Sequence, residues 1–137
     1  MSACTALGFD LGTRRIGVAV GQTLTGTASP LRILKTRRGT PDWEAIKRLV
    51  EEWEPSAMVV GMPFHMDGSV HERAGETQRF ARQLHGRYGV PVYTVDERLS
   101  THEARARAPS GEGLDAIAAQ LILESWLAQA NDGRARW

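Results

Sequence analysis

Small and apolar residues alternate through the start of the chain and predict two short strands, at residues 5–11 and 16–21. The segment between them, GTRR, has the length of a turn, and Gly12 supplies the backbone freedom that a turn needs. The two strands are therefore expected to pair as an antiparallel hairpin. A third strand is predicted at residues 28–35, where Pro30 suits the edge of a sheet better than its centre.

The segment TPDWEAIKRLVEEW has the pattern of an amphipathic helix, because its apolar residues recur at helical spacing. We expect Thr40 to be the N-cap, Pro41 to take the first helical position and Asp42 to lie in the first turn. Pro55 then ends the helix. The remaining elements are predicted as a buried strand at 57–62, a helix at 70–88 ended by Gly89, a strand at 90–95, a short helix beginning at Ser100 and a nearly apolar helix at 114–130.

This order of elements indicates a mixed α/β sheet in which the first three strands are antiparallel and the remaining strands are parallel. Strands that alternate with helices connect by right-handed crossovers, which produce the parallel part. The 137 residues suffice for one domain with its own hydrophobic core, so residues 1–137 are expected to fold as a single unit. In such sheets, ligands bind at the carboxyl ends of the parallel strands.

Acidic residues stand near these predicted strand ends. Asp10 lies late in the first strand, Asp96 and Glu97 directly follow the last strand, and Asp115 lies in the first turn of the final helix. Carboxylates from separate segments repel one another unless a cation lies between them, and oxygen ligands suit Mg²⁺ or Mn²⁺. Each residue also has an ordinary structural interpretation, namely a turn for Asp10, an ion pair with Arg98 for Asp96 or Glu97, and the helix dipole for Asp115. Spacing alone leaves both interpretations open.

A net charge of +1 does not by itself indicate nucleic-acid binding. Basic residues nevertheless lie beside the acidic ones and in the stretch RILKTRR, and the candidates for phosphate contact are Arg14, Arg15, Arg37, Arg38 and Arg98. The single cysteine, Cys4, excludes a disulfide within the chain. No basic leader precedes the first apolar run, and no apolar run approaches membrane-spanning length. We therefore expect a cytoplasmic protein with no membrane partner.

Four blocks of the sequence, GFDLGTRRIGVAVGQ, VVGMPFHMDGS, DERLST and LDAIAAQLILESWL, resemble in this order the YqgF/RuvX family of Holliday junction resolvases or pre-16S rRNA nucleases. The resemblance spans essentially the whole chain and implies a ribonuclease H-like fold. It also implies a metal-dependent nuclease whose carboxylates fall on Asp10, Glu97 and Asp115, with Asp96 as the second choice. The chain differs from the family at His65, where asparagine is usual, and in a short segment at 108–114.

The resemblance favours hydrolysis of phosphodiester bonds at the 5′ end of precursor 16S rRNA, with Mg²⁺ or Mn²⁺ as the metal. One alternative is a Holliday junction resolvase that cuts branched DNA, and another is a nucleic-acid-binding factor that uses its arginines without its carboxylates. The phrase DLGT also resembles the phosphate loop of actin-like and sugar-kinase ATPases, but those two-domain enzymes need a much longer chain. The expected partner is nucleic acid, and the expected state is a monomer or a weak homodimer.

Overall fold

The computed structural model describes residues 4–12, 14–38, 40–63, 67, 69, 72–96 and 114–131, with the side chains of 116–129 in the last of these segments. Within this part of the chain, five strands form one sheet in the order β3-β2-β1-β4-β5. The antiparallel strands are β1 (Thr5–Leu11), β2 (Arg15–Gln22) and β3 (Thr27–Lys35). β4 (Ala57–Met62) runs parallel to β1, and β5 (Val92–Asp96) runs parallel to β4. The predicted mixed sheet and its hairpin are confirmed.

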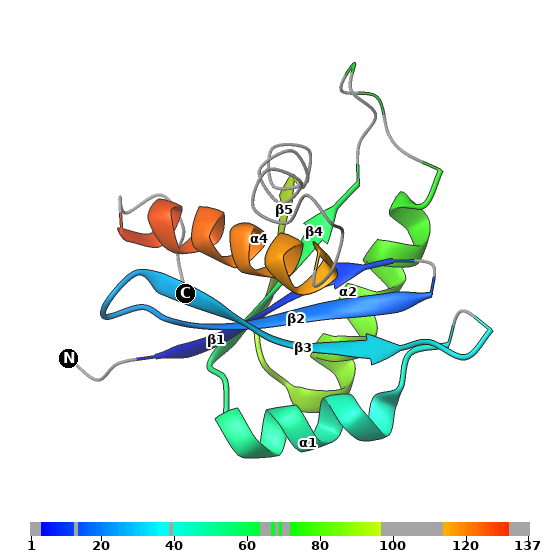
Figure 1. Ribbon diagram of the computed structural model, residues 1–137, viewed down its shortest axis with the longest axis horizontal. Coiled ribbons are helices and arrows are strands. Elements are labelled where there is room, and N and C mark those ends of the chain that lie inside the picture. Colours follow the sequence, from blue (N-terminus) through cyan, green and yellow to red (C-terminus); the bar gives the residue numbers. More distant parts are fainter. Residues whose placement is uncertain are drawn as a thin grey trace.

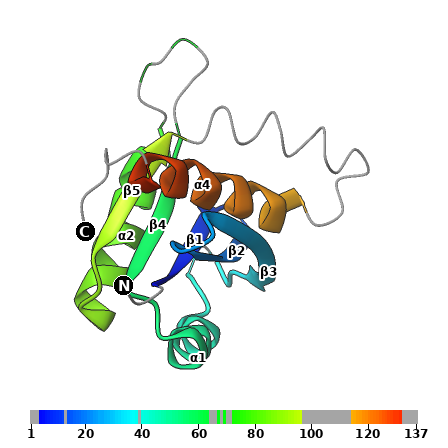
Figure 2. The same ribbon diagram turned by 90° about the vertical axis from the view of Figure 1, so that its left-hand side faces the viewer.

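Helices cover both faces of this sheet. α4 (Leu114–Asn131) lies across one face, and α1 (Trp43–Trp53) and α2 (Ala74–Tyr88) lie across the other (Figures 1 and 2). Strand residues alternate between the two resulting cores. Ala6, Ala57, Val59 and Val95 pack with α4 residues such as Trp126, whereas Leu7, Phe9, Met58 and Val60 pack with α1 and α2 residues such as Phe80. The even-numbered residues of β1 and the odd-numbered residues of β4 and β5 therefore face α4.

The start of α1 differs from the sequence prediction. Asp42 is the N-cap, because its Oδ1 accepts a hydrogen bond from the Ala45 amide at 3.1 Å. The backbone of Thr40 is instead engaged with Arg37 through two reciprocal hydrogen bonds of 3.0 and 2.9 Å. This turn places Thr40 outside the helix, so the prediction of Thr40 as N-cap was wrong. The helix ends at Trp53 before Pro55, as predicted.

The bounds of α2 and β5 also differ from the prediction. α2 begins at Ala74, later than the predicted residue 70, and ends before Gly89 at a φ of 66°, as predicted. β5 begins at Val92 and includes Asp96, so Asp96 ends the strand instead of following it. The helix predicted to begin at Ser100 lies outside the described residues. Of the helices that the structure describes, none is long and apolar enough to cross a membrane.

Candidate functional site

Asp10 lies on the face of β1 that α4 covers. It is half-buried and shares this face with Ala6 and Gly8, because successive strand side chains point to opposite faces. Gly8 fixes the approach of the helix, since a Cβ added there would lie 2.9 Å from the Leu123 Cβ and 3.0 Å from the Ala119 carbonyl oxygen. The Asp10 carboxylate therefore belongs to the edge of the α4 interface rather than to the α1 and α2 core.

The neighbours of Asp10 in the sheet are glycines. Asp10 pairs directly with Gly17 of β2. On the other side Phe9 pairs with Val60 of β4, which sets Asp10 level with Gly61. Residues level with one another in adjacent strands point to the same face, so neither flanking strand places a side chain beside Asp10. The two strands that flank this carboxylate therefore present only backbone beside it.

The packing of α4 on the sheet indicates that the first turn of this helix lies toward Asp10. A Cβ at Gly21, which pairs with Ala6, would contact Leu123 and Leu127, whereas a Cβ at Gly8 would contact Ala119 and Leu123. Movement along β1 toward its carboxyl end therefore corresponds to movement toward the start of α4. Two strand residues advance about 6.7 Å, and four helical residues advance about 6 Å. The distance along β1 from Gly8 to Asp10 is thus similar to the distance along α4 from Ala119 back to Asp115.

The register of β5 distinguishes the two carboxylates of the DER block. Val95 pairs with Gly61 and packs in the α4 core, so it is level with Asp10 on the same face. Asp96, the next residue, belongs to the opposite face and is exposed. A strand continued by one residue would return to the α4 face at Glu97, but Glu97 lies outside the described residues.

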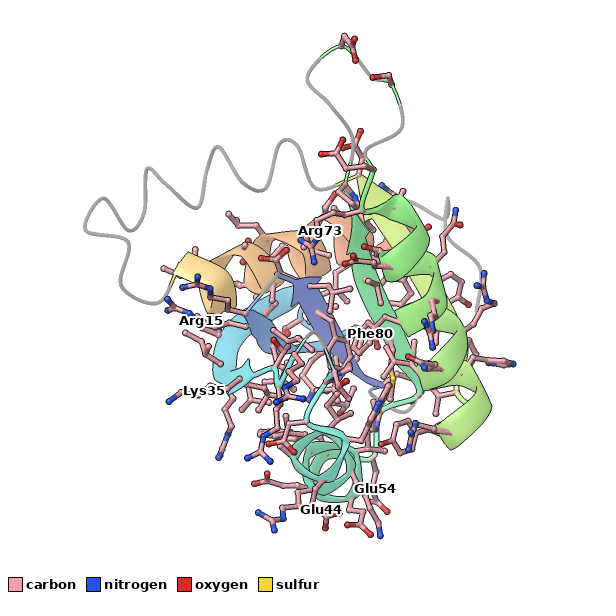
Figure 3. All side chains as sticks on the ribbon, turned by 90° about the vertical axis from the view of Figure 1, so that its right-hand side faces the viewer. Arg15, Lys35, Glu44, Glu54, Arg73 and Phe80 are labelled. Atoms are coloured by element: carbon pink, nitrogen blue, oxygen red, sulfur yellow. The ribbon has the colours of Figure 1, made fainter. Side chains whose placement is uncertain are left out.

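The predicted basic residues gather at the same end of the sheet. Arg14, in the connection from β1 to β2, and Arg15, at the start of β2, are both exposed. Arg15 pairs with Lys35, and the Arg14 carbonyl oxygen accepts a hydrogen bond from the Thr36 amide at 2.9 Å. The exposed Arg37 and Arg38 follow directly in the chain. Figure 3 views this end of the molecule and labels Arg15, Lys35 and Arg73 there. Arg98 and His65 lie outside the described residues.

Sequence reasoning missed Arg73. Its Nη1 donates a hydrogen bond to the Leu11 carbonyl oxygen at 3.3 Å, directly after Asp10, while Nε and Nη2 donate to Glu76 Oε2 at 3.2 and 3.1 Å. The spacing of Arg73 and Glu76 signals a local helical ion pair and nothing more. The link to β1 joins residues far apart in the sequence, so no local pattern predicts it. Arg73 thereby fixes the end of the strand that carries Asp10.

A divalent cation fits the donor chemistry of the Asp10 carboxylate, because carboxylate oxygens are the ligands that Mg²⁺ and Mn²⁺ prefer. The flanking glycines add no side chain beside it. In the part of the chain that the structure describes, no cluster of three acidic, histidine or cysteine side chains is present. The side chains of Glu97 and Asp115, which complete the predicted set, are not among those described.

Comparison with known proteins identifies relatives over almost the whole chain. The model of the family described as RuvX, Holliday junction resolvase, matches residues 4–129. A protein of Azotobacter vinelandii named as a pre-16S rRNA nuclease is 53% identical over 135 residues, which cover 93% of this chain and 95% of that protein. A protein of Pseudomonas aeruginosa strain LESB58 with the same name is 48% identical over 134 residues, covering 92% of this chain and 93% of that protein.

Solved structures share the fold at low sequence identity. Thermus thermophilus RuvC in complex with a Holliday junction substrate aligns with a TM-score of 0.63 and 20% identity, covering 97% of this chain and 98% of that one. The fowlpox virus Holliday junction resolvase aligns with a TM-score of 0.56 and 13% identity, covering 92% of this chain and 99% of that one. These likenesses confirm the predicted ribonuclease H-like architecture.

Proposed function

The chain belongs to the RuvX family of Holliday junction resolvases, and on this premise we propose that it is a metal-dependent nuclease that processes precursor 16S rRNA. The observation that supports this most strongly is the position of Asp10 between Gly17 and Gly61, facing the first turn of α4. This position puts a carboxylate at the carboxyl end of a strand that runs parallel to β4, where such sheets bind ligands.

Asp10, Glu97 and Asp115 would hold the metal. Each is acidic: Asp10 lies near the end of β1, Asp115 lies in the first turn of α4, and Glu97 directly follows the last residue of β5 in the sequence. A divalent metal bound there would activate water and stabilise the negative charge that develops on a phosphodiester during hydrolysis. Asp96 is assigned a structural role, because its register directs it to the face opposite Asp10.

The protein's own residues supply positioning. Gly17 and Gly61 place no side chain beside Asp10, which would let a phosphate approach the carboxylate from the flanking strands. Arg73 holds the Leu11 carbonyl oxygen and so orients the end of β1. The exposed guanidinium groups of Arg14 and Arg15 bind the phosphate backbone of the incoming strand, and Arg98 is the further candidate from the DER block.

Precursor rRNA is the substrate we favour, because the relatives at 53% and 48% identity carry the name of pre-16S rRNA nucleases. A bacterial precursor rRNA would place the protein in the cytoplasm. Branched DNA is the second candidate, and the description of the matching family favours it. A resolvase must cut two strands and would be expected to act as a symmetric dimer, whereas a single cut in a leader RNA requires one active site.

A side-by-side cleavage assay tests these assignments. The purified protein is given a 16S rRNA precursor with its leader and a four-way DNA junction, with Mg²⁺ and Mn²⁺ in separate reactions and Asp10→Asn as the control. We expect cleavage of the RNA leader by the wild type and none by Asp10→Asn. Cleavage of the junction alone would establish the resolvase, and metal-independent binding without cleavage of either substrate would establish a non-catalytic binding factor.

A further inference from the structure

A groove runs along the end of the sheet on the face opposite α4. One hollow of about 480 Å³ lies beside the end of β1 and α2, and a second of about 1140 Å³ lies along the connection from β3 to α1. The two hollows share Arg38, Thr40, Pro41 and Trp43, so they form one continuous groove. We call it the basic groove and define it by its cationic lining residues, Lys35, Arg37, Arg38, Arg73 and Arg79.

Positive charge dominates this groove. The acidic residues that line it are Asp42 and Glu76, and both are engaged. The Asp42 carboxylate caps α1 by accepting from the Ala45 amide, and the Glu76 carboxylate accepts from Arg73. Across the segments that the structure describes, Arg38 and Arg79 make no ion pair. Two guanidinium groups from distant parts of the sequence are therefore available to an anion in the groove.

The backbone of Arg38 is held in a conformation that its side chain disfavours. Its φ is 53°, in the left-handed region where glycine is the usual residue. The reciprocal hydrogen bonds between Arg37 and Thr40 close the turn around it. Arg38 is exposed, so packing does not require an arginine at this position. Backbone strain of this kind is a feature of ligand-binding sites.

The groove begins next to the candidate catalytic residue. Leu11 and Gly12, which follow Asp10 directly, line it, and Arg73 joins the Leu11 carbonyl oxygen to the start of α2. A strand whose phosphate lies at Asp10 on the α4 face would thus pass over the end of β1 and enter the groove. Trp43 lines the groove, but its ring already packs on Phe80 with centroids 5.6 Å apart and beneath the Arg87 guanidinium at 4.0 Å. The groove therefore presents cations rather than a free surface for base stacking.

We propose that the basic groove binds the phosphate backbone of the nucleic-acid strand that flanks the cleaved bond, with Arg38 and Arg79 each contacting a phosphate. This inference rests on the proposed nuclease function and adds the path of the strand. Contacts to phosphates carry no base information, so the groove positions the substrate without selecting its sequence.

Binding measured without metal tests the groove separately from cleavage. Fluorescence anisotropy of a labelled RNA strand, and of the DNA strand of the same sequence, is recorded in EDTA over a series of salt concentrations. For Arg79→Ala and for Arg38→Gly, we expect several-fold weaker binding and a log-log salt slope smaller by about 0.7, the value for one lost contact to a single strand. Arg82→Ala is the matched control, because Arg82 is an exposed arginine of α2 that does not line the groove.

Arg38→Gly provides a second readout that a structural role would not give. Glycine relieves the left-handed backbone, so the midpoint of thermal unfolding is expected to rise while binding weakens. Unchanged salt slopes for both variants, or a loss no greater than that of Arg82→Ala, would overturn the proposal even if the wild type cleaves RNA. A loss confined to RNA or to DNA would also contradict backbone binding. Smaller salt slopes for both variants, together with a wild type that cleaves neither substrate, would support phosphate binding in the groove and refute the proposed nuclease function.

Discussion

Gly8 of β1 lies so close to Leu123 of α4 that a Cβ added at Gly8 would stand 2.9 Å from the Cβ of Leu123. The backbone of the helix also lies against the strand, because the same added Cβ would stand 3.0 Å from the Ala119 carbonyl oxygen. β1 carries Asp10 and α4 carries Asp115. The absence of a side chain at Gly8 therefore sets the spacing between the two segments that supply the proposed metal ligands.

Replacement of this glycine should displace α4. We expect Gly8→Ala to lower the free energy of unfolding by about 1–3 kcal/mol, the usual cost of overpacking a core. The matched control is Gly86→Ala in α2, where an added Cβ meets nothing within 4 Å. Alanine in a helix should stabilise that variant by about 0.5–1 kcal/mol. Urea unfolding of both variants measures the difference, and equal stabilities would show that α4 does not depend on the close approach.

Asp10→Asn should abolish cleavage while the fold is retained. The substitution removes a charge from a group of carboxylates that repel one another, so stability without metal should be unchanged or higher. Cleavage should fall by more than about a hundredfold, because weaker perturbations of metal sites already cost 10- to 100-fold. Thermal unfolding in EDTA and cleavage with Mn²⁺ or Mg²⁺ check the two halves. Wild-type cleavage, or a strong loss of stability, would identify Asp10 as structural.

The two carboxylates of the DER block should respond differently. Asp96 belongs to the face opposite Asp10, so Asp96→Asn is expected to lower stability before it affects cleavage. Glu97→Gln is expected to lose cleavage at ordinary stability. The two variants are each other's control, since both remove one negative charge at adjacent positions. Loss of cleavage in Asp96→Asn with full activity in Glu97→Gln would transfer the metal-binding role to Asp96.

Alkaline pH should weaken the packing of α2. Burial raises the pKa of the Tyr88 hydroxyl above its ordinary value, Arg87 opposes this shift, and Glu51 and Glu44 add to it. The folded state thus holds the phenolic proton more tightly than the unfolded state. This contribution to stability is fully present below the unfolded pKa of about 10 and is lost as the pH rises through the folded pKa.

Urea unfolding across this alkaline range measures the effect. The free energy of unfolding should fall more steeply with pH in the wild type than in Tyr88→Phe, which has no phenolic proton to lose. Parallel curves for the wild type and Tyr88→Phe would show that Tyr88 does not contribute.

Local patterns in the sequence predict the order of the strands and helices that the structure describes. Residues 5–11 predicted a strand with Asp10 near its end, and the structure has β1 at Thr5–Leu11. The apolar run 57–62 predicted a buried strand, and all six of its residues are buried in β4. Such patterns are local, because burial of a face imposes the period of the element on the residues that form it. The ribonuclease H-like fold followed from these elements together with the resemblance.

Contacts between distant segments resolve the cases in which local signals favoured two outcomes equally. Thr40 and Asp42 are both good N-caps, and the turn between Arg37 and Thr40 selects Asp42. Both faces of β5 are mostly apolar, so only its pairing with β4 and the packing of α4 place Asp96 opposite Asp10. The basic groove joins Arg38 to Arg79 across a long stretch of chain. Each of these outcomes depends on contacts between distant segments, which exist only after the sheet has assembled and the helices have packed on it.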